Sequence, residues 1–142
     1  MAGTQYDKYI LRQTGSKKSS GAIPAVLPMA LADAKDWNGI QHRINWKHIS
    51  QPTVLVKEAH THDFDQFLLF LGNDAANASN FGAEAEILMG KEGEKQIING
   101  ATVICIPRGM VHGPLSVTKV IRPILFCNIY LSPDYVRKPV KR

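Results

Sequence analysis

Apolar and polar residues alternate along most of the chain after residue 40. Short runs such as TVLVKEAHTH (53–62), AEAEILMG (83–90) and RPILFCNIYLS (122–132) are rich in strand-forming residues, and Gly, Asn and Pro separate them. About eight such strands follow one another, without a long amphipathic helix pattern and without an internal repeat. The pattern therefore predicts an all-β sandwich or barrel.

The first forty residues have a different composition. GSKKSSG (15–21) is typical of a flexible linker, and IPAVLP (23–28) contains two prolines that interrupt regular structure. We therefore expect an N-terminal arm at 1–40, a barrel domain at 41–134 and a basic C-terminal tail at 135–142.

The composition is that of one folded domain. The chain has 142 residues, of which 44% are hydrophobic and 20% charged. It contains no apolar run long enough to span a bilayer and no signal-peptide layout at its start. Cys105 and Cys127 both lie in apolar runs, which predicts buried free thiols and a reducing compartment. We expect a cytoplasmic protein with no membrane partner.

The net charge of +5 raises the question of nucleic-acid binding. The basic residues, however, concentrate near the two ends of the chain, and no helix-turn-helix, zinc-finger or aromatic-basic pattern accompanies them. Solvated, charged ends explain the excess, so we expect no nucleic-acid partner.

Two histidines one residue apart are the first candidate site. In a strand, residues i and i+2 face the same side, so His60 and His62 project together. Buried imidazoles need partners for their nitrogens, and a divalent cation would satisfy both at once. Exposure to solvent would satisfy them as well, so the pair alone leaves both interpretations open.

A third histidine follows about fifty residues later. The stretch GATVICIPRGMVHGP (100–114) is typical of a strand, a tight turn and a second strand, and Pro107 and Gly109 define the turn. This reversal would bring His112 back along a neighbouring strand.

Together the two segments resemble the two motifs of the cupin superfamily. The first is His-x-His followed by a glutamate and a glycine, and the second is a glycine followed by Pro-x-Gly and a histidine. The matching residues here are His60, His62, Gln66, Gly72, Gly100, Pro107, Gly109 and His112. The resemblance covers roughly residues 45–131 and implies a double-stranded β-helix (jelly-roll) barrel, often with a metal ion near one mouth and often a homodimer.

The chain also departs from the cupin motifs. Val54 stands where the first motif begins with glycine, Gly72 and Gly100 are each one residue off the commonest spacing, and Ser116 replaces a frequent asparagine. The largest departure is Gln66, which takes the place of the usual glutamate ligand.

The resemblance implies a metal held by His60, His62, His112 and Gln66, with Asp65 as the alternative fourth ligand. All four side chains are neutral, so the full charge of a divalent ion would remain to attract an anionic or enolisable substrate. Zinc, nickel, iron, manganese and cobalt all suit such donors.

Two glutamates are candidate acid-base groups. Glu58 shares the strand parity of His60, and Glu86 lies in the strand that follows the loop NDAANASNFGAEA (73–85). Both could equally be ordinary surface charges. We further expect this loop to cover the mouth of the barrel.

The leading functional hypothesis is a small metal-dependent enzyme with isomerase-, lyase- or cyclase-type non-redox chemistry on a small polar or anionic metabolite. An iron-dependent dioxygenase is the second hypothesis, and a non-catalytic small-molecule-binding cupin is the third. A homodimer is expected in each case.

Overall fold

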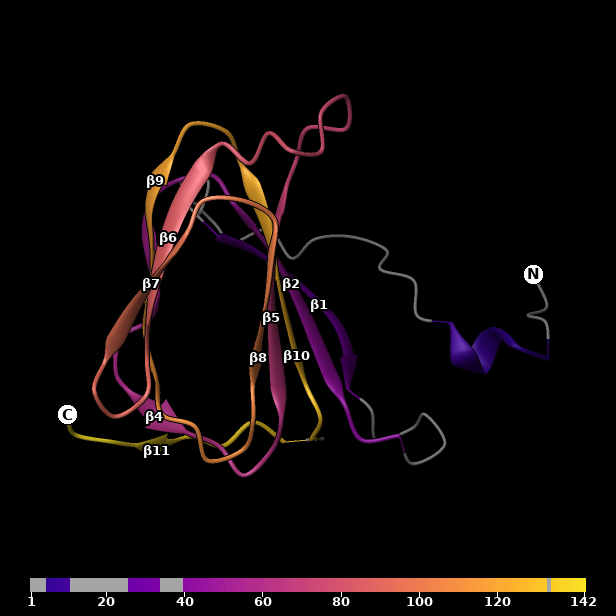
Figure 1. Cartoon of the computed structure of the whole chain (residues 1–142). Helices are drawn as coiled ribbons and strands as arrows, with labels where there is room; N and C mark the ends of the chain where they lie inside the picture. Colours follow the sequence, from indigo (N-terminus) through magenta and orange to yellow (C-terminus); the bar gives the residue numbers. More distant parts are fainter. Residues whose placement is uncertain (1–4, 11–25, 34–39, 133) are drawn as a thin grey trace, which may run out of the picture.

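Two antiparallel β-sheets face each other and enclose an apolar core (Figure 1). The computed structural model describes residues 5–10, 26–33, 40–132 and 134–142. The first sheet contains, in spatial order, β1 (Val26–Asp33), β2 (Arg43–Ile49), β10 (Ile124–Tyr130), β5 (Gln66–Gly72) and β8 (Thr102–Ile106). The second contains β11 (Lys138–Pro139), β4 (His60–Thr61), β9 (His112–Val120), β6 (Ala83–Met89) and β7 (Glu94–Ile98), and β3 (Thr53–Val56) pairs with β9. A short 3₁₀ helix, η1 (Asp7–Tyr9), precedes them. The all-β jelly-roll prediction is confirmed.

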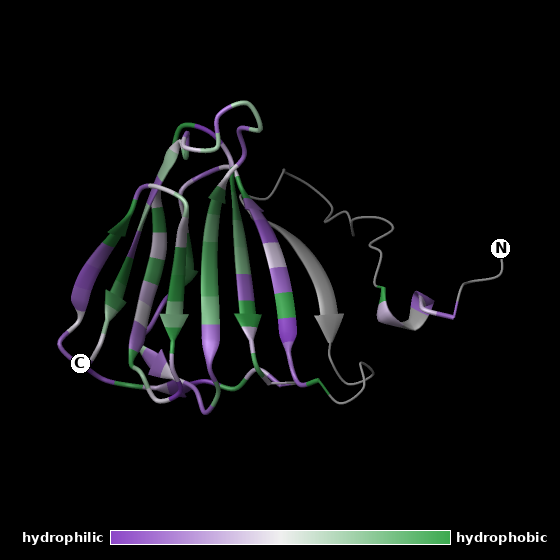
Figure 2. Cartoon of the chain, turned by 45° about the vertical axis from the view of Figure 1, so that its right-hand side comes forward, coloured by the Kyte–Doolittle hydropathy of each residue, from purple (hydrophilic) through white to green (hydrophobic). Residues whose placement is uncertain are grey.

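Alternation along the strands builds the core, as the banded hydropathy of the strands in Figure 2 shows. In β5, Gln66, Leu68 and Phe70 are buried, while the residues between them are more exposed. The same period of two in β6 buries Ala85 and Ile87. The core therefore consists of inward residues from both sheets, chiefly Ile49, Leu68, Phe70, Phe81, Ile87, Ile98, Ile106, Leu115, Val117, Ile124 and Phe126.

The expected N-terminal arm contains a strand. β1 pairs with β2 from Val26 opposite Ile49 to Asp33 opposite Arg43, although Pro28 lies within it. The two prolines were predicted to interrupt regular structure here, and that expectation is wrong for Val26–Asp33. The reason is position: β1 is the edge strand of its sheet, and an edge strand tolerates a residue without an N–H group. The linker-like stretch at 15–21 lies outside the described residues.

The direction of the strands separates the two ends of the barrel. β5 begins at Gln66, opposite Tyr130, and ends at Gly72, opposite Ile124. The connection 73–82 follows Gly72, so it lies at the end of the barrel far from Gln66 (Figure 1). The expectation that this loop covers the mouth with the histidines is therefore wrong.

The two cysteines differ in burial. Cys127 is buried as predicted, whereas Cys105 is exposed, because it faces outward from β8 next to the buried Ile106. Both thiols are free. Among the residues that the structure describes, no helix has the length and apolar character needed to cross a membrane.

Candidate metal centre

Three buried histidines meet at one end of the second sheet. His60 opens β4, His112 opens β9, and the two residues are directly paired across these strands. His62 follows β4 immediately, and by strand alternation it projects to the same side as His60. The ligand atoms of the three rings all lie within 4.8 Å of one another. The structure thus brings the three predicted histidines together.

Each ring is oriented by a backbone carbonyl. The Nδ1 atom of His60 lies 3.1 Å from the carbonyl oxygen of Glu58, and that of His112 lies 3.0 Å from the carbonyl oxygen of Met110. The Nδ1 atom of His62 lies 2.7 Å from the carbonyl oxygen of Val136. A carbonyl can only accept, so each Nδ1 carries the proton and donates it. All three Nε2 atoms therefore keep a free lone pair.

The Nε2 atoms of His60 and His62 are 3.0 Å apart. With both Nδ1 atoms protonated in the neutral rings, two lone pairs face each other at this distance, which is repulsive unless a cation lies between them. Burial also lowers the pKa of all three rings, and for His112 to about 4. The imidazoles are thus neutral at pH 7, the form that binds a metal ion. The donor set fits a divalent cation.

Gln66 supplies a further oxygen at the same end of the barrel. Its Nε2 group donates to Asn128 Oδ1 at 2.8 Å, which fixes the amide and leaves Oε1 buried without a hydrogen-bond partner. A buried acceptor of this kind is costly unless a ligand satisfies it. The carboxylate of Asp65, the alternative ligand, instead accepts the N–H of Arg108 at 2.9 Å outside the barrel mouth.

Two glycines of the second histidine segment bring it against the first. Gly109 adopts φ +81° in the turn and donates its N–H to the carbonyl of His62 at 2.9 Å. Gly113 adopts φ +98°, and a Cβ placed there would lie 2.6 Å from the carbonyl oxygen of Glu58. That oxygen is the one that orients His60. The absence of a side chain at Gly113 therefore allows β9 to approach the histidine pair.

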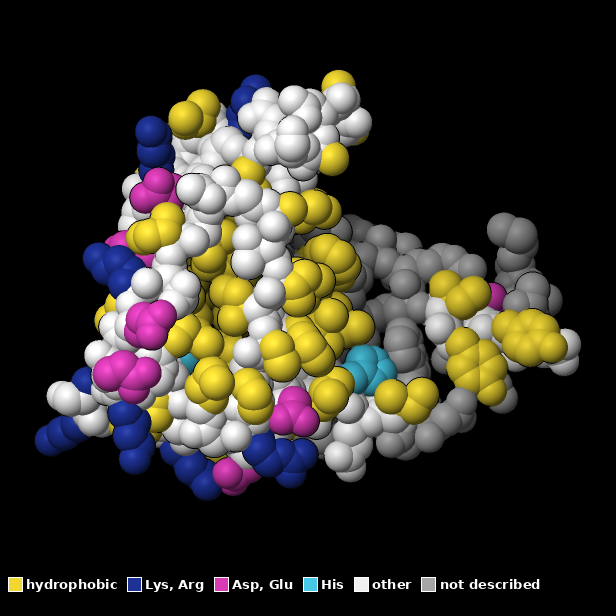
Figure 3. All heavy atoms as spheres, viewed as in Figure 1, with side chains coloured by type: hydrophobic (Ala, Val, Ile, Leu, Met, Phe, Trp, Pro, Cys, Tyr) yellow, Lys and Arg dark blue, Asp and Glu magenta, His cyan; other side chains and the backbone are white. Residues whose placement is uncertain are grey.

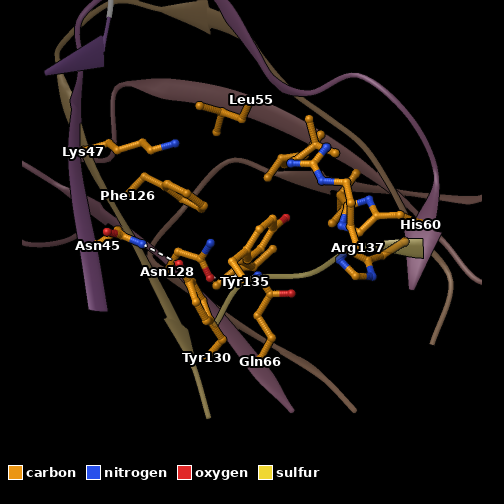
Figure 4. A pocket seen from close by; sticks show the side chains of 15 residues that line it. Asn45, Lys47, Leu55, His60, Gln66, Phe126, Asn128, Tyr130, Tyr135 and Arg137 are labelled. Atoms are coloured by element: carbon orange, nitrogen blue, oxygen red, sulfur yellow. Dashed lines mark hydrogen bonds between the residues drawn. The ribbon is translucent and has the colours of Figure 1, made fainter. Parts of the chain in front are cut away.

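A cavity of about 190 Å³ opens beside the histidines. It is smaller than the ~300–1,000 Å³ of pockets for drug-sized ligands, so it suits a small metabolite. His60, His112 and Gln66 line it together with Asn45, Lys47, Leu55, Val56, Leu68, Ile87, Leu115, Phe126, Asn128, Tyr130, Tyr135 and Arg137. Figure 4 shows Lys47 and Arg137 projecting into the cavity from opposite sides.

The charge of the cavity is positive. Among the described residues, Lys47 and Arg137 are the charged side chains that line it, and no carboxylate does. Burial, and secondarily the nearby Arg137 guanidinium, lower the pKa of Lys47. The cavity thus presents two cationic groups beside a neutral donor set, which favours a negatively charged ligand.

No family model and no curated protein sequence matches the chain. Similar solved structures include an oxalate oxidase in complex with the substrate analogue glycolate (12% identity, TM-score 0.60), with 94% of this chain and 64% of that chain covered. The polyketide cyclase RemF from Streptomyces resistomycificus (15% identity, TM-score 0.58) is covered over 87% of its length, again with 94% of this chain. An oxalate decarboxylase of Bacillus subtilis (9% identity, TM-score 0.54) matches 84% of this chain and 29% of its own.

These three proteins are cupins, and they share with this chain the two-sheet barrel. The chain has the cupin fold. The resemblance found in the two sequence motifs is confirmed. This chain spans less than two thirds of the oxalate oxidase chain and less than a third of the oxalate decarboxylase chain. At these identities the likeness establishes the fold, and the chemistry has to be argued from the site.

The structure places neither candidate glutamate in the cavity. Glu58 is exposed and contributes its backbone carbonyl to the orientation of His60. Glu86 lies on the outer side of β6, where its carboxylate is 3.5 Å from the ammonium of Lys95. Neither carboxylate therefore lines the cavity.

Several cavity residues were missed by the sequence analysis. Lys47 and Asn128 come from β2 and β10, whose alternation was visible although their inward faces were not. Tyr135 and Arg137 belong to the segment that was expected to be a solvated tail. The available signal was parity: Asn45 and Lys47, like Asn128 and Tyr130, are two residues apart, as inward strand positions must be.

Proposed function

We propose that this cupin is a metal-dependent enzyme that carries out isomerase-, lyase- or cyclase-type chemistry, without a redox step, on a small anionic metabolite. The observation that carries the proposal is the junction of two features in one small cavity. His60 and His112, two of the three clustered histidines, line it together with Gln66, whose Oε1 has no partner, and the cationic side chains of Lys47 and Arg137 line it as well.

His60, His62, His112 and Gln66 would hold the metal. When bound, a divalent cation would supply Lewis-acid polarisation of a carbonyl or enolate oxygen. Its donors are neutral, so its positive charge would add to that of the cavity. This set fits Lewis-acid chemistry better than the iron dioxygenase pattern, in which a carboxylate is a common ligand.

The walls of the cavity provide groups that bind and move protons. Lys47 can hold an anionic group of the substrate as an ammonium ion, and its lowered pKa makes a proton on Nζ easier to give up than on a solvated lysine. We assign it the acid-base role that Glu58 and Glu86 were expected to have. The Tyr130 hydroxyl accepts a hydrogen bond from Asn45 at 3.0 Å, which leaves its own O–H to donate to a substrate oxygen.

Elemental mass spectrometry of the purified protein tests the proposal. We expect near-stoichiometric divalent metal in the wild type and its loss in the His60→Ala/His112→Ala double variant. His48→Ala is the matched control, because His48 lies on β2 outside the cavity lining. Circular dichroism of all three proteins shows whether the fold is retained.

The outcomes separate the three functional hypotheses. A metal that supports turnover of carboxylate or keto-acid substrates without oxygen uptake would bear out the proposal. Iron together with oxygen consumption would favour the dioxygenase. If the wild type takes up no metal after reconstitution, both enzyme hypotheses fail and the binding module remains.

The outer face of the first sheet supports a homodimer. Residues paired across its strands form apolar rows on the side away from the core, and Figure 3 shows apolar side chains gathered over β5 and β8. These rows are Ile44, Ile129, Phe67 and Cys105, then Trp46, Cys127, Leu69 and Val103, and then Leu125 and Leu71, with His48 beside Leu125. A second copy of the same face would cover them by sheet-on-sheet packing.

Analytical ultracentrifugation of the wild type and of Val103→Asp tests this dimer. Val103 is 64% exposed, so a charge there should leave the monomer folded and lower the sedimentation coefficient. A wild type that sediments as a monomer would refute the proposed dimer.

The free thiols of Cys105 and Cys127 support the proposed cytoplasmic location, because disulfides are rare in reducing compartments.

A further inference from the structure

Residues 135–142, here called the C-terminal strap, lie across the histidine end of the barrel. Within the strap, β11 pairs with β4, so that Lys138 lies opposite Thr61 and Pro139 opposite His60 (Figure 1). The N–H of Val140 donates to the carbonyl of Ala59 at 2.9 Å. The strap therefore continues the second sheet beside His60 and His62.

Charged side chains fasten the strap at both ends of this pairing. The Lys138 ammonium lies 2.8 Å from the carboxylate of Asp63. The Arg142 guanidinium donates to the carbonyl of Gly90 through Nε at 3.0 Å and Nη2 at 2.9 Å, and also to the carbonyls of Leu88 and Gly113. The basic residues that looked like a solvated tail are thus engaged with the barrel.

The strap orients His62, whose Nδ1 atom bonds to a residue far away in the sequence. The acceptors for His60 and His112 each lie two residues before the histidine, so these two rings are fixed locally. The acceptor for His62 is the carbonyl of Val136, 74 residues away in the strap. The tautomer and ring direction of His62 therefore depend on the strap being docked.

The strap also forms part of the cavity wall. The Tyr135 ring lies with its centroid 4.9 Å from that of His62, and the Arg137 guanidinium carbon lies 5.3 Å from the Tyr135 ring centroid. Both side chains line the cavity, and Figure 4 shows Arg137 beside His60. Arg137 also hydrogen-bonds the Tyr135 side chain, but among the described residues no carboxylate pairs with it, so the charge of its guanidinium remains available to an anionic ligand.

We propose that the C-terminal strap is a positioning element of the active site. It holds His62 in the metal-binding orientation through the Val136 carbonyl, and it places Arg137 where the guanidinium binds the anionic group of the substrate. This inference rests on the proposed metal-dependent function, because it assigns the strap its role toward the same metal and the same anion.

The proposed orientation of His62 by the strap is tested by the metal affinity of the purified apoprotein, measured by competition with a chelator. Relative to the wild type, we expect a 10- to 100-fold weaker Kd for Zn²⁺ in a chain ending at residue 132, as for lost second-sphere partners of metal ligands. The Co²⁺-loaded protein should show altered visible ligand-field bands, which a merely structural effect of the strap would not change.

A full-length pair guards against a truncated chain that does not fold. Arg142→Gln removes contacts to three backbone carbonyls, whereas Lys141→Gln alters an exposed charge. We expect weaker Zn²⁺ binding in Arg142→Gln and wild-type binding in Lys141→Gln. Equal Kd values in wild type, Arg142→Gln and any folded truncated chain would overturn the proposal. If the wild type itself binds no metal, the proposed function fails first, so the two failures are distinguishable.

The proposed binding of an anion by Arg137 is tested with the Arg137→Gln variant in its metal-loaded form. Malonate, oxaloacetate and phosphate are the probes in calorimetry. We expect Zn²⁺ affinity to stay at the wild-type value and the tightest probe to bind at least about tenfold more weakly, as after loss of one charge-assisted contact. Unchanged affinity in the variant, or no binding of any probe by the wild type, would overturn the role of Arg137.

Discussion

The two ends of the barrel are built from the same strands, but the side chains that face inward are polar at one end and apolar at the other. At the histidine end, β2, β5 and β10 place Asn45, Gln66 and Tyr130 in the cavity. At the far end the same strands bury Ile49, Phe70 and Ile124.

The contacts at the two ends differ accordingly. At the histidine end, side chains are oriented by partners far away in the sequence, such as Asn128 for the Gln66 amide nitrogen and Val136 for His62. At the far end, Asp74 accepts the N–H groups of Ala76 and Asn77 within the loop 73–82, and the carbonyl of Gly82 accepts those of residues 121 and 122. The apolar end thus provides stability and the polar end provides a site, at separate positions of the same strands.

The largest expected effect separates stability from metal binding at the apolar end. Phe70→Ala should lower the free energy of unfolding by about 3–5 kcal/mol, because Phe70 is fully buried in the core. Urea denaturation measures this, and Leu71→Ala on the exposed side of the same strand is the control, with less than about 1 kcal/mol expected. Zn²⁺ affinity of the folded Phe70→Ala protein should stay at the wild-type value. A weakened affinity would contradict this separation, because it would show that metal binding depends on packing at the apolar end.

Gly113→Ala should affect both properties at once. The left-handed φ of Gly113 costs an alanine about 1–2 kcal/mol, and its Cβ would push against the Glu58 carbonyl that orients His60. We expect a loss of roughly 2 kcal/mol or more in stability together with weaker metal binding. Gly100→Ala is the matched control, since a Cβ there meets no atom within 4 Å. Equal losses of stability and metal affinity in the two variants would contradict this role of Gly113.

The pH dependence of the metal-free protein should come from the histidine end. Burial lowers the pKa of His112 from 6.5 to about 4, and of His60 and His62 in the same direction. Unfolding then takes up protons, so stability is full above pH ~6.5 and is lost as the pH falls towards 4, at most about 1.4 kcal/mol per pH unit for one proton.

Urea midpoints in the presence of a chelator at pH 7.5, 5.5 and 4.5 measure this dependence. His112→Gln should flatten the slope between pH 6.5 and 4. The far end contributes in a different window, because hydrogen bonds to its own loop keep the pKa of the Asp74 carboxyl below 3.8. A slope that His112→Gln leaves unchanged would place its origin elsewhere.

Substitution of Gln66 should change metal affinity with little change in fold. Gln66→Leu removes the unpartnered Oε1 and should weaken the Zn²⁺ Kd about tenfold, or about 1.4 kcal/mol. Gln66→Glu should bind Zn²⁺ more tightly than the wild type, because a carboxylate neutralises part of the charge. Chelator competition measures both. Unchanged affinity in both variants would exclude Gln66 from the ligand set.

The smallest effect is expected in the loop 73–82. Asp74→Ala removes hydrogen bonds to Ala76, Asn77 and Asn80 at exposed positions, so we expect a loss of less than about 1 kcal/mol and no change in metal or ligand affinity. Altered ligand binding would restore the idea that this loop reaches the cavity. Urea denaturation and calorimetry provide the two measurements.

The sequence was most informative where local parity and turn chemistry apply. His60 and His62 had to share a face, and Pro107 and Gly109 had to reverse the chain, so the three-histidine cluster could be predicted. The position of Asp65 could not be, because its carboxylate is drawn to Arg108 across the turn. Glu58 and Glu86 were plausible acids until the pairing of β6 placed Glu86 on the outside.

By itself the sequence determined an all-β sandwich or barrel and the shared face of His60 and His62, because alternation with period two and glycine- or proline-defined turns are local properties of the chain. The cupin type and the third histidine followed from the resemblance of the two motifs. Only the tertiary structure decided which end of the barrel holds the cavity, that Lys47 and Arg137 face it, and that Val136 orients His62. These features depend on strand order and on contacts between residues far apart in sequence, which no local pattern encodes.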